Sequence, residues 1–154
     1  MLSLKEWISK VSDWINKQNS IITVNPSGNI TRSGTGDSIV GSYSTINKNG
    51  GSLTNSGSAV VVGQGIKLVE VSYQLSVGTT GTNHIVNGQL YINSVMQGAF
   101  SQDTRQAQSG MGYVNKTPML VSVNSGDLLQ IGWYGQTGDT LYSSGTVLTV
   151  KAIA

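Results

Sequence analysis

The sequence predicts an all-β sandwich preceded by one short helix, and three observations support this fold class. First, five apolar residues alternate strictly with polar ones, which is typical of a strand with one buried face: Val69, Val71, Tyr73, Leu75 and Val77. Second, turn sequences interrupt the β-prone runs about every 8–12 residues. Third, 10% of the residues are charged, and the polar surface is carried mainly by Ser, Thr, Asn and Gln beside 20 glycines.

The first element is an amphipathic helix, which we predict over residues 3–17. Ser3 fits an N-cap, and Glu6 three residues later completes a capping box. Apolar residues then recur at spacings of three and four. They form what we call the helix stripe: Leu4, Trp7, Ile8, Val11, Trp14 and Ile15.

The helix stripe needs a cover, because a lone helix of about 15 residues is marginal in water. One cover is the chain's own β domain, and the other is another copy of the helix or a partner protein. In heptad terms Leu4 and Val11 share one seam position, and Trp7 and Trp14 share the next. This spacing favours trimerisation or docking through residues 1–18.

Residues 19–58 form a transition region rich in turn residues. Asn25–Gly28 and Lys48–Gly51 are turn sequences. The short β-prone runs between them fit a neck or the first hairpins of the domain, and we predict a neck with short strands. These runs are Ile21–Val24, Asn29–Arg32 and Ser38–Ile46.

Residues 59–154 carry the clearest β pattern and are predicted to form the head. Besides the run at 69–77, alternation returns at residues 119–123 and 129–133, and Val147–Ile153 is continuously β-prone. About 95 residues with turns at this spacing give roughly eight strands, which is the jelly-roll number.

Charge and composition exclude several classes of function. The net charge is +2 and the nine basic residues are scattered, so no basic face for nucleic acid is expected. There is no cysteine, hence no disulfide or thiolate metal site. Charged residues interrupt the N-terminus, which is unlike a signal peptide, and no apolar run is long enough for membrane insertion.

Catalytic and metal-binding patterns are weak. The one histidine, His84, fits a sugar contact or a pH switch, but a polar residue at the start of a strand is the simpler interpretation. Asp103 and Asp139 are the pair that a glycosidase would need, although nothing in the sequence brings them together. We therefore expect no enzyme, no cofactor and no metal.

The segment from Trp133 to Tyr142 is the most suggestive of ligand binding. Aromatic rings stack on the apolar faces of sugars, and amides and carboxylates bind hydroxyl groups. A second polar loop, residues 102–106, adds two candidates. The alternative is that Trp133 is core and the tyrosines line a subunit contact. The candidate ligand-binding residues are Trp133, Tyr134, Gln136, Asp139, Tyr142, Asp103 and Arg105.

Two stretches resemble known families. The opening Met1–Ile8 resembles the N-termini of small structural or appendage proteins encoded by phages and prophages of gut bacteria. The C-terminal part resembles the C1q/TNF-like jelly roll, in three segments: Gly65–Val77, Val121–Ile131 with its Asn124–Asp127 turn, and Gly145–Ile153. The resemblance implies a tight homotrimer with a role in attachment.

Together these features lead to an expected function. The chain is expected to be a virion protein of the tail-fibre or receptor-binding type, made in the host cytoplasm. Its trimeric head would bind a host-surface carbohydrate or a neighbouring virion protein. A decoration or assembly protein without any ligand, and a glycan-cleaving enzyme, are the alternatives.

Overall fold

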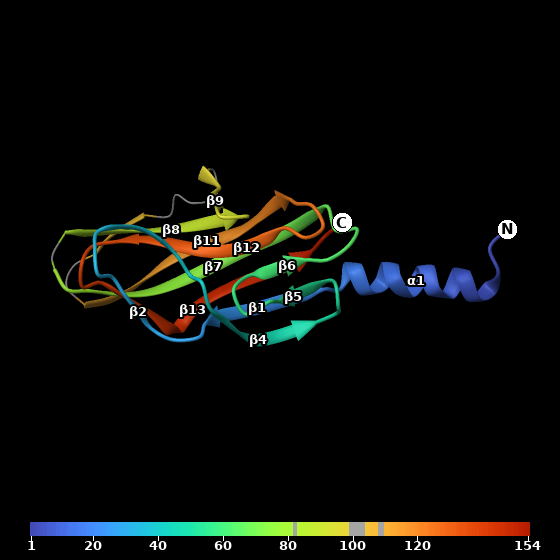
Figure 1. Ribbon diagram of the computed structural model, residues 1–154, viewed down its shortest axis with the longest axis horizontal. Coiled ribbons are helices and arrows are strands. Elements are labelled where there is room, and N and C mark those ends of the chain that lie inside the picture. The colour runs from blue at the N-terminus through green and yellow to red at the C-terminus, as the bar shows by residue number, and fades with distance from the viewer. Residues whose placement is uncertain (82, 99–103, 108–109) are drawn as a thin grey trace.

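The computed structural model describes residues 1–81, 83–98, 104–107 and 110–154. A single helix projects from one end of an elongated β sandwich, and the C-terminus lies at that same end (Figure 1). The helix, α1, spans Leu4–Gln18 and confirms the predicted N-terminal helix. Ser3 caps it as expected: its hydroxyl accepts from the Glu6 N–H at 3.2 Å, and its own N–H donates to Glu6 Oε2 at 2.7 Å.

The sandwich consists of two antiparallel sheets, here named sheet A and sheet B. In the described part of the chain, sheet A runs in the order β11-β7-β13-β1-β4, with β2 beside β13. Its strands are β1 (Ile21–Pro26), β2 (Ile30–Thr31), β4 (Tyr43–Asn49), β7 (Leu68–Thr79), β11 (Gly110–Ser122) and β13 (Thr140–Ala152).

Sheet B runs in the order β10-β8-β12-β6-β5, with β3 beside β12 and β9 beside β8. Its strands are β3 (Gly36–Ile39), β5 (Leu53–Asn55), β6 (Val60–Val62), β8 (His84–Ile92), β9 (Val95–Met96), β10 (Thr104–Ala107) and β12 (Leu128–Gly135). Eight of the labelled strands, β6 to β13, lie within residues 59–154, which is the number predicted for that region.

The core lies between the sheets and is filled by the inward side of each strand. In β7 the predicted alternation is observed, with Val69, Val71, Tyr73, Leu75 and Val77 all buried. Sheet B contributes Val86, Leu90, Leu129, Ile131 and Trp133 to the same core. A clean period of two therefore located the buried face of the longest strands correctly.

Residues 19–58 contribute strands to both sheets of the sandwich. β1 lies between β13 and β4 in sheet A, and β3 and β5 extend sheet B. The segment also fills part of the core, with Ile22, Val24 and Leu53 fully buried. These short strands thus pair within the same two sheets as residues 59–154, and the division into neck and head stays a prediction.

The predicted strand Ser38–Ile46 is split in two because the chain changes sheets there. β3 ends at Ile39 in sheet B, and β4 begins at Tyr43 in sheet A. Tyr43 reaches back across the core, where its hydroxyl accepts from the Ile131 N–H at 2.9 Å and contacts the Ile131 carbonyl at 3.3 Å. These contacts give hydrogen-bond partners to the backbone of Ile131, which lies in β12 between the residues paired with β6 and those paired with β3. Burial raises the pKa of Tyr43.

Candidate functional site

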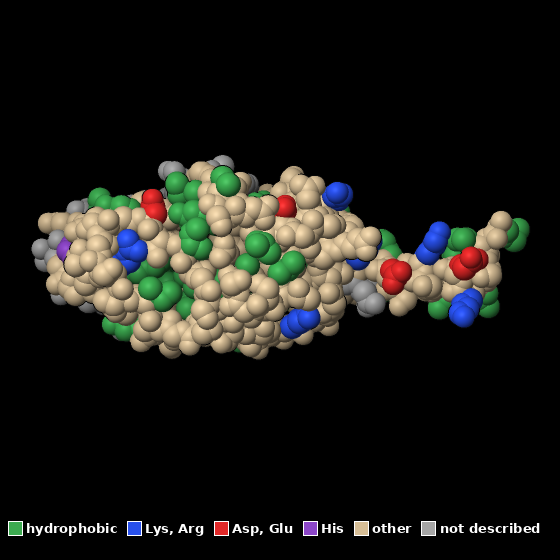
Figure 2. All heavy atoms as spheres, viewed as in Figure 1, with side chains coloured by type: hydrophobic (Ala, Val, Ile, Leu, Met, Phe, Trp, Pro, Cys, Tyr) green, Lys and Arg blue, Asp and Glu red, His purple; other side chains and the backbone are tan. Residues whose placement is uncertain are grey.

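The end of the sandwich opposite the helix is organised around one fully buried carboxylate, that of Asp139. Its Oδ1 lies 2.7 Å from His84 Nδ1 and accepts from the Thr80 N–H at 3.2 Å. Its Oδ2 accepts from the Gln136 N–H at 2.9 Å. We call these four residues the Asp139 cluster. Figure 2 shows the histidine at this far end.

The Asp139 cluster joins three loops. Besides the β7–β8 and β12–β13 connections, it holds the segment after β2, because the Arg32 N–H donates to the Asp139 carbonyl at 2.8 Å. The Arg32 guanidinium lies over the Trp133 ring, 5.9 Å from its centroid. Buried carboxylates are stable when such donors surround them, so Asp139 acts as a structural centre for this end of the head.

The structure separates the candidate ligand-binding residues. Trp133 is fully buried in the core, and Asp139 is fully buried in its cluster, so neither presents a surface to a ligand here. Gln136 is half-buried in the β12–β13 turn, where its backbone N–H donates to the Asp139 carboxylate. The alternative interpretation of Trp133 as a core residue is confirmed.

The two tyrosines lie on opposite outer faces. Tyr134 follows inward-facing Trp133 in β12 and points out of sheet B. Tyr142 follows inward-facing Leu141 in β13 and points out of sheet A, where its ring lies against Gly78. One ligand therefore cannot contact both rings. Between these two tyrosines the chain passes from sheet B to sheet A. Residues that are close in the sequence therefore lie on different sheets.

The second candidate loop is placed only in part. Asp103 lies outside the described residues, so its predicted role stays a prediction. Arg105 lies in β10, where it is the Cα partner of Val86 in β8. Its contribution to ligand binding is likewise a prediction.

Sequence reasoning missed a polar group on the outer face of sheet B. Gln89 Nε2 donates to Asp37 Oδ1, across 52 positions of sequence. The Tyr91 hydroxyl donates to Gln89 Oε1 at 3.1 Å. In the sequence Asp37 follows Gly34-Thr35-Gly36, a stretch typical of a turn, and no local pattern links it to β8. Its partners become visible only when β3, β12 and β8 are paired.

The helix stripe is uncovered. Leu4 is 72% exposed, Trp7 56% and Trp14 62%. Ile8 and Ile15 are also exposed, and Val11 is half-buried. The helix extends away from the sandwich instead of lying on it (Figure 1), so the cover by the chain's own β domain is not observed. Near its base, the Lys17 side chain lies against Gly65.

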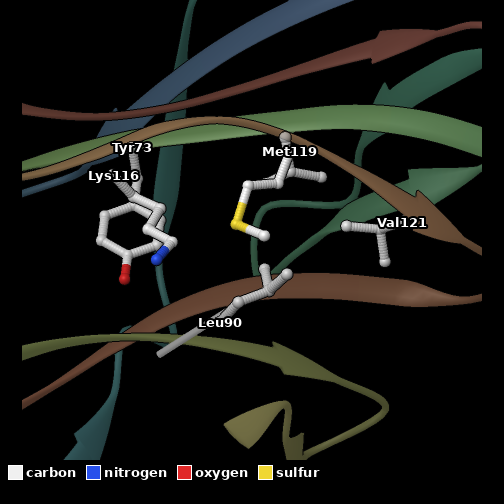
Figure 3. A pocket seen from close by; sticks show the side chains of 6 residues that line it. Tyr73, Leu90, Lys116, Met119 and Val121 are labelled. Atoms are coloured by element: carbon white, nitrogen blue, oxygen red, sulfur yellow. The ribbon is translucent and has the colours of Figure 1, made fainter. Parts of the chain in front are cut away.

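Apolar side chains line one edge of the sandwich, where β11 of sheet A approaches β8 of sheet B. Figure 3 shows Met119 and Leu90 pointing toward one another from the two sheets beside Tyr73, Lys116 and Val121. Exposed apolar residues also occur on the outer faces of the two sheets and on β9: Tyr113, Leu120, Ile85, Val95 and Met96. Green patches in Figure 2 show that apolar side chains reach the surface of the head.

Neither a metal site nor a membrane-spanning helix is found within the described residues. No three His, Asp or Glu side chains there gather as metal ligands would. The helix in this part of the chain is not long and apolar enough to cross a membrane.

Comparison with known proteins identifies the class of fold. No protein-family model matches the chain, and no curated protein sequence matches it significantly. Among solved structures, murine APRIL aligns over 88% of this chain and 99% of its own, with 12% identity and a TM-score of 0.63. Eiger TNF from S. frugiperda aligns over 88% and 94%, with 11% identity and a TM-score of 0.60.

A viral structural protein shares the same architecture. PRD1 vertex protein P5 aligns over 88% of this chain and 98% of its own, with 15% identity and a TM-score of 0.55. At these identities the comparisons define the fold alone. The chain is an all-β, TNF-like jelly roll with a short N-terminal helix, as the sequence predicted.

Proposed function

We propose that this chain is a trimeric structural and attachment module of a phage particle, in which the helix associates and the jelly-roll head faces outward. One observation carries the proposal: a head with a filled core is joined to a helix whose stripe is exposed. Apolar surface left in water costs about 25 cal/mol per Å². A short helix with two exposed tryptophans is therefore expected to bury them against something.

Two further copies of the chain are the occupant that we propose for the helix stripe. Leu4 with Val11 and Trp7 with Trp14 repeat at seven residues, the spacing that keeps a seam facing neighbouring helices. Lys5, Lys10 and Asp13 are also exposed but lie off this spacing. Such a bundle would hold three heads side by side at their helix-bearing ends.

Exposed apolar side chains on the head support the same assembly. In a monomer, Tyr113 and Leu120 would remain 54% and 56% exposed on β11, and Val95 62% exposed on β9. Exposed apolar groups of this kind are common at protein interfaces. The C1q/TNF family that the sequence resembles forms trimers, and contacts between heads would bury side chains of this kind.

A place on a virion is supported by the fold shared with PRD1 vertex protein P5 and by the phage-like opening Met1–Ile8. The partners would be a neighbouring virion protein and a carbohydrate of the host surface. Three weak sites on one rigid trimer bind a surface far more strongly than one site does. A decoration role without any ligand is favoured instead if the trimer binds no glycan.

Trp7→Ala combined with Trp14→Ala should weaken the trimer, because it removes both aromatic side chains from the helix stripe. Light scattering coupled to gel filtration should give three times the chain mass for the wild type at micromolar concentration. The double variant should shift to lower mass, with the β-sheet circular dichroism unchanged.

A matched double variant on the polar side of the helix, Ser9→Ala with Ser12→Ala, should retain the wild-type mass. A wild-type chain that is monomeric at micromolar concentration would overturn the proposal. So would a trimer that both double variants leave equally intact, because the stripe would then not be the element of association.

A further inference from the structure

The outer face of sheet B carries a row of three polar or aromatic side chains on adjacent strands. Tyr134 of β12 is the Cα partner of Asp37 in β3 and also of Asn87 in β8. Cross-strand partners share a face, so Asp37, Tyr134 and Asn87 form one line, which we call the sheet B row. The row spans two strand spacings, roughly 10 Å.

The Asp37 carboxylate is exposed, but a chain of hydrogen bonds through buried side chains fixes its position. Gln89 Nε2 donates to Asp37 Oδ1, and the Tyr91 hydroxyl donates to Gln89 at 3.1 Å. Gln89 is 4% exposed and Tyr91 7% exposed, although both belong to an outer face. Burial, and then the nearby charge of Asp37, raise the pKa of Tyr91, which keeps its hydroxyl a donor.

A glycine makes this arrangement sterically possible. Gly132 lies two residues before Tyr134 in β12. It is the Cα partner of Gln89 in β8 and of Ile39 in β3. A Cβ at Gly132 would come within 2.8 Å of the Ser38 carbonyl and would overlap the Tyr91 ring. The bare backbone therefore leaves room for the Tyr91 ring, whose hydroxyl donates to Gln89.

The other end of the row holds the buried amide oxygen of Asn87. Asn87 Oδ1 is buried and accepts no hydrogen bond from the described residues. Buried acceptors without a donor are uncommon in folded proteins. The row thus combines an oriented carboxylate, a half-buried tyrosine ring and an amide whose oxygen lies below the surface.

We propose that the sheet B row binds a single neutral sugar ring. The Tyr134 ring packs against the apolar face of the sugar, and the Asp37 carboxylate accepts hydrogen bonds from its hydroxyl groups. The charged member of the row is an anion, so sugars that carry a carboxylate are repelled. The inference deepens the proposed function by naming the ligand class and its site, but it concerns one chain and does not need the trimer.

The test is saturation-transfer NMR on the full-length chain with methyl α-mannopyranoside, methyl β-galactopyranoside and methyl β-glucopyranoside. We expect transfer to at least one of them in the millimolar range, and none to N-acetylneuraminic acid. Asp37→Asn keeps an acceptor for Gln89 but removes the charge, and should weaken binding by about tenfold. Tyr134→Leu should abolish transfer.

Tyr142→Leu is the matched control, because Tyr142 is also half-buried but lies on the outer face of sheet A. It should bind the sugar like the wild type. Absence of transfer to all three sugars would overturn the inference, and so would equal losses in the Tyr134 and Tyr142 variants with native circular dichroism. Light scattering on the same samples separates the two proposals: a trimer without sugar binding overturns this inference alone, and a sugar-binding monomer overturns the trimer alone.

Discussion

The helix and the head of this protein differ in how their apolar residues are used. Leu75, Leu148 and Trp133 in the head have no exposed surface, whereas Trp7 and Trp14 in the helix are more than half exposed. The strands of the head pair with one another and pack around a common core within one chain. The helix completes the hydrogen bonds of its first turn locally, through Ser3 and Glu6, but no residue in the described part of the chain covers its stripe.

This difference indicates a division of labour. A filled core gives the head its stability, because each buried side chain contributes both transfer free energy and close packing. An exposed stripe contributes nothing until a second surface meets it. The head is therefore expected to fold whether or not the chains associate, and the helix is expected to report on association.

Leu75→Ala should give the largest effect and tests the head side of the comparison. Leu75 is fully buried at the centre of β7, so its truncation leaves a cavity and should lower the free energy of unfolding by about 2–5 kcal/mol. Urea unfolding followed by the β-sheet circular dichroism, at one fixed protein concentration, measures the loss.

Leu4→Ala is the matched change in the helix. It should shift the unfolding free energy of the head by no more than about 0.5 kcal/mol, as substitutions at exposed sites do, while lowering the mass seen by light scattering. Equal destabilisation by the two variants would show that helix and head unfold as one unit, and the comparison would fail.

The sequence predicted the long elements well for a physical reason. In β7, β12 and β13 one face meets the core along most of the strand, so the period of two appears directly in the residue types. The helix was predicted with nearly correct ends, because its capping box and its spacing of three and four are local signals.

What escaped prediction depends on which sheet each segment joins. The split between β3 and β4, and the sheets that residues 19–58 join, follow from pairings with β12 and β13 far along the chain. The candidate site failed to assemble for the same reason, since Tyr134 and Tyr142 are close in sequence but belong to different sheets. Gln89 and Asp37 meet through two strand pairings that no local pattern reveals.

Asp139→Asn should have an intermediate effect, confined to the end of the head opposite the helix. The carboxylate accepts from two backbone N–H groups and contacts His84, and an amide nitrogen in place of one oxygen would face a donor. We expect a loss of about 1–3 kcal/mol, with faster hydrogen exchange at the Thr80 and Gln136 amides.

The turn residue Asp127 supplies the control for this change. Its carboxylate accepts from the Asn124 N–H and the Asn93 amide, but it is only half-buried. Asp127→Asn should cost less and leave exchange at Thr80 unchanged. Unaltered protection of Thr80 and Gln136 in Asp139→Asn would remove the carboxylate from its role as the centre of that end.

The smallest effect concerns the helix alone and is a pH dependence. Hydrogen bonds from the Ser3 N–H and hydroxyl hold the pKa of Glu6 below its usual range. Because the folded pKa is lowered, the ionised carboxylate stabilises the first turn at any pH above the pKa that Glu6 has in the unfolded chain. This contribution is lost as the pH falls through the lowered, folded pKa. An NMR titration of the Glu6 carboxyl carbon should therefore give a midpoint below that of an ordinary glutamate, and Ser3→Ala should raise it. A midpoint in the usual range, unmoved by Ser3→Ala, would mean that the capping box does not persist in solution. In that case the start of the helix, like its stripe, would depend on a partner.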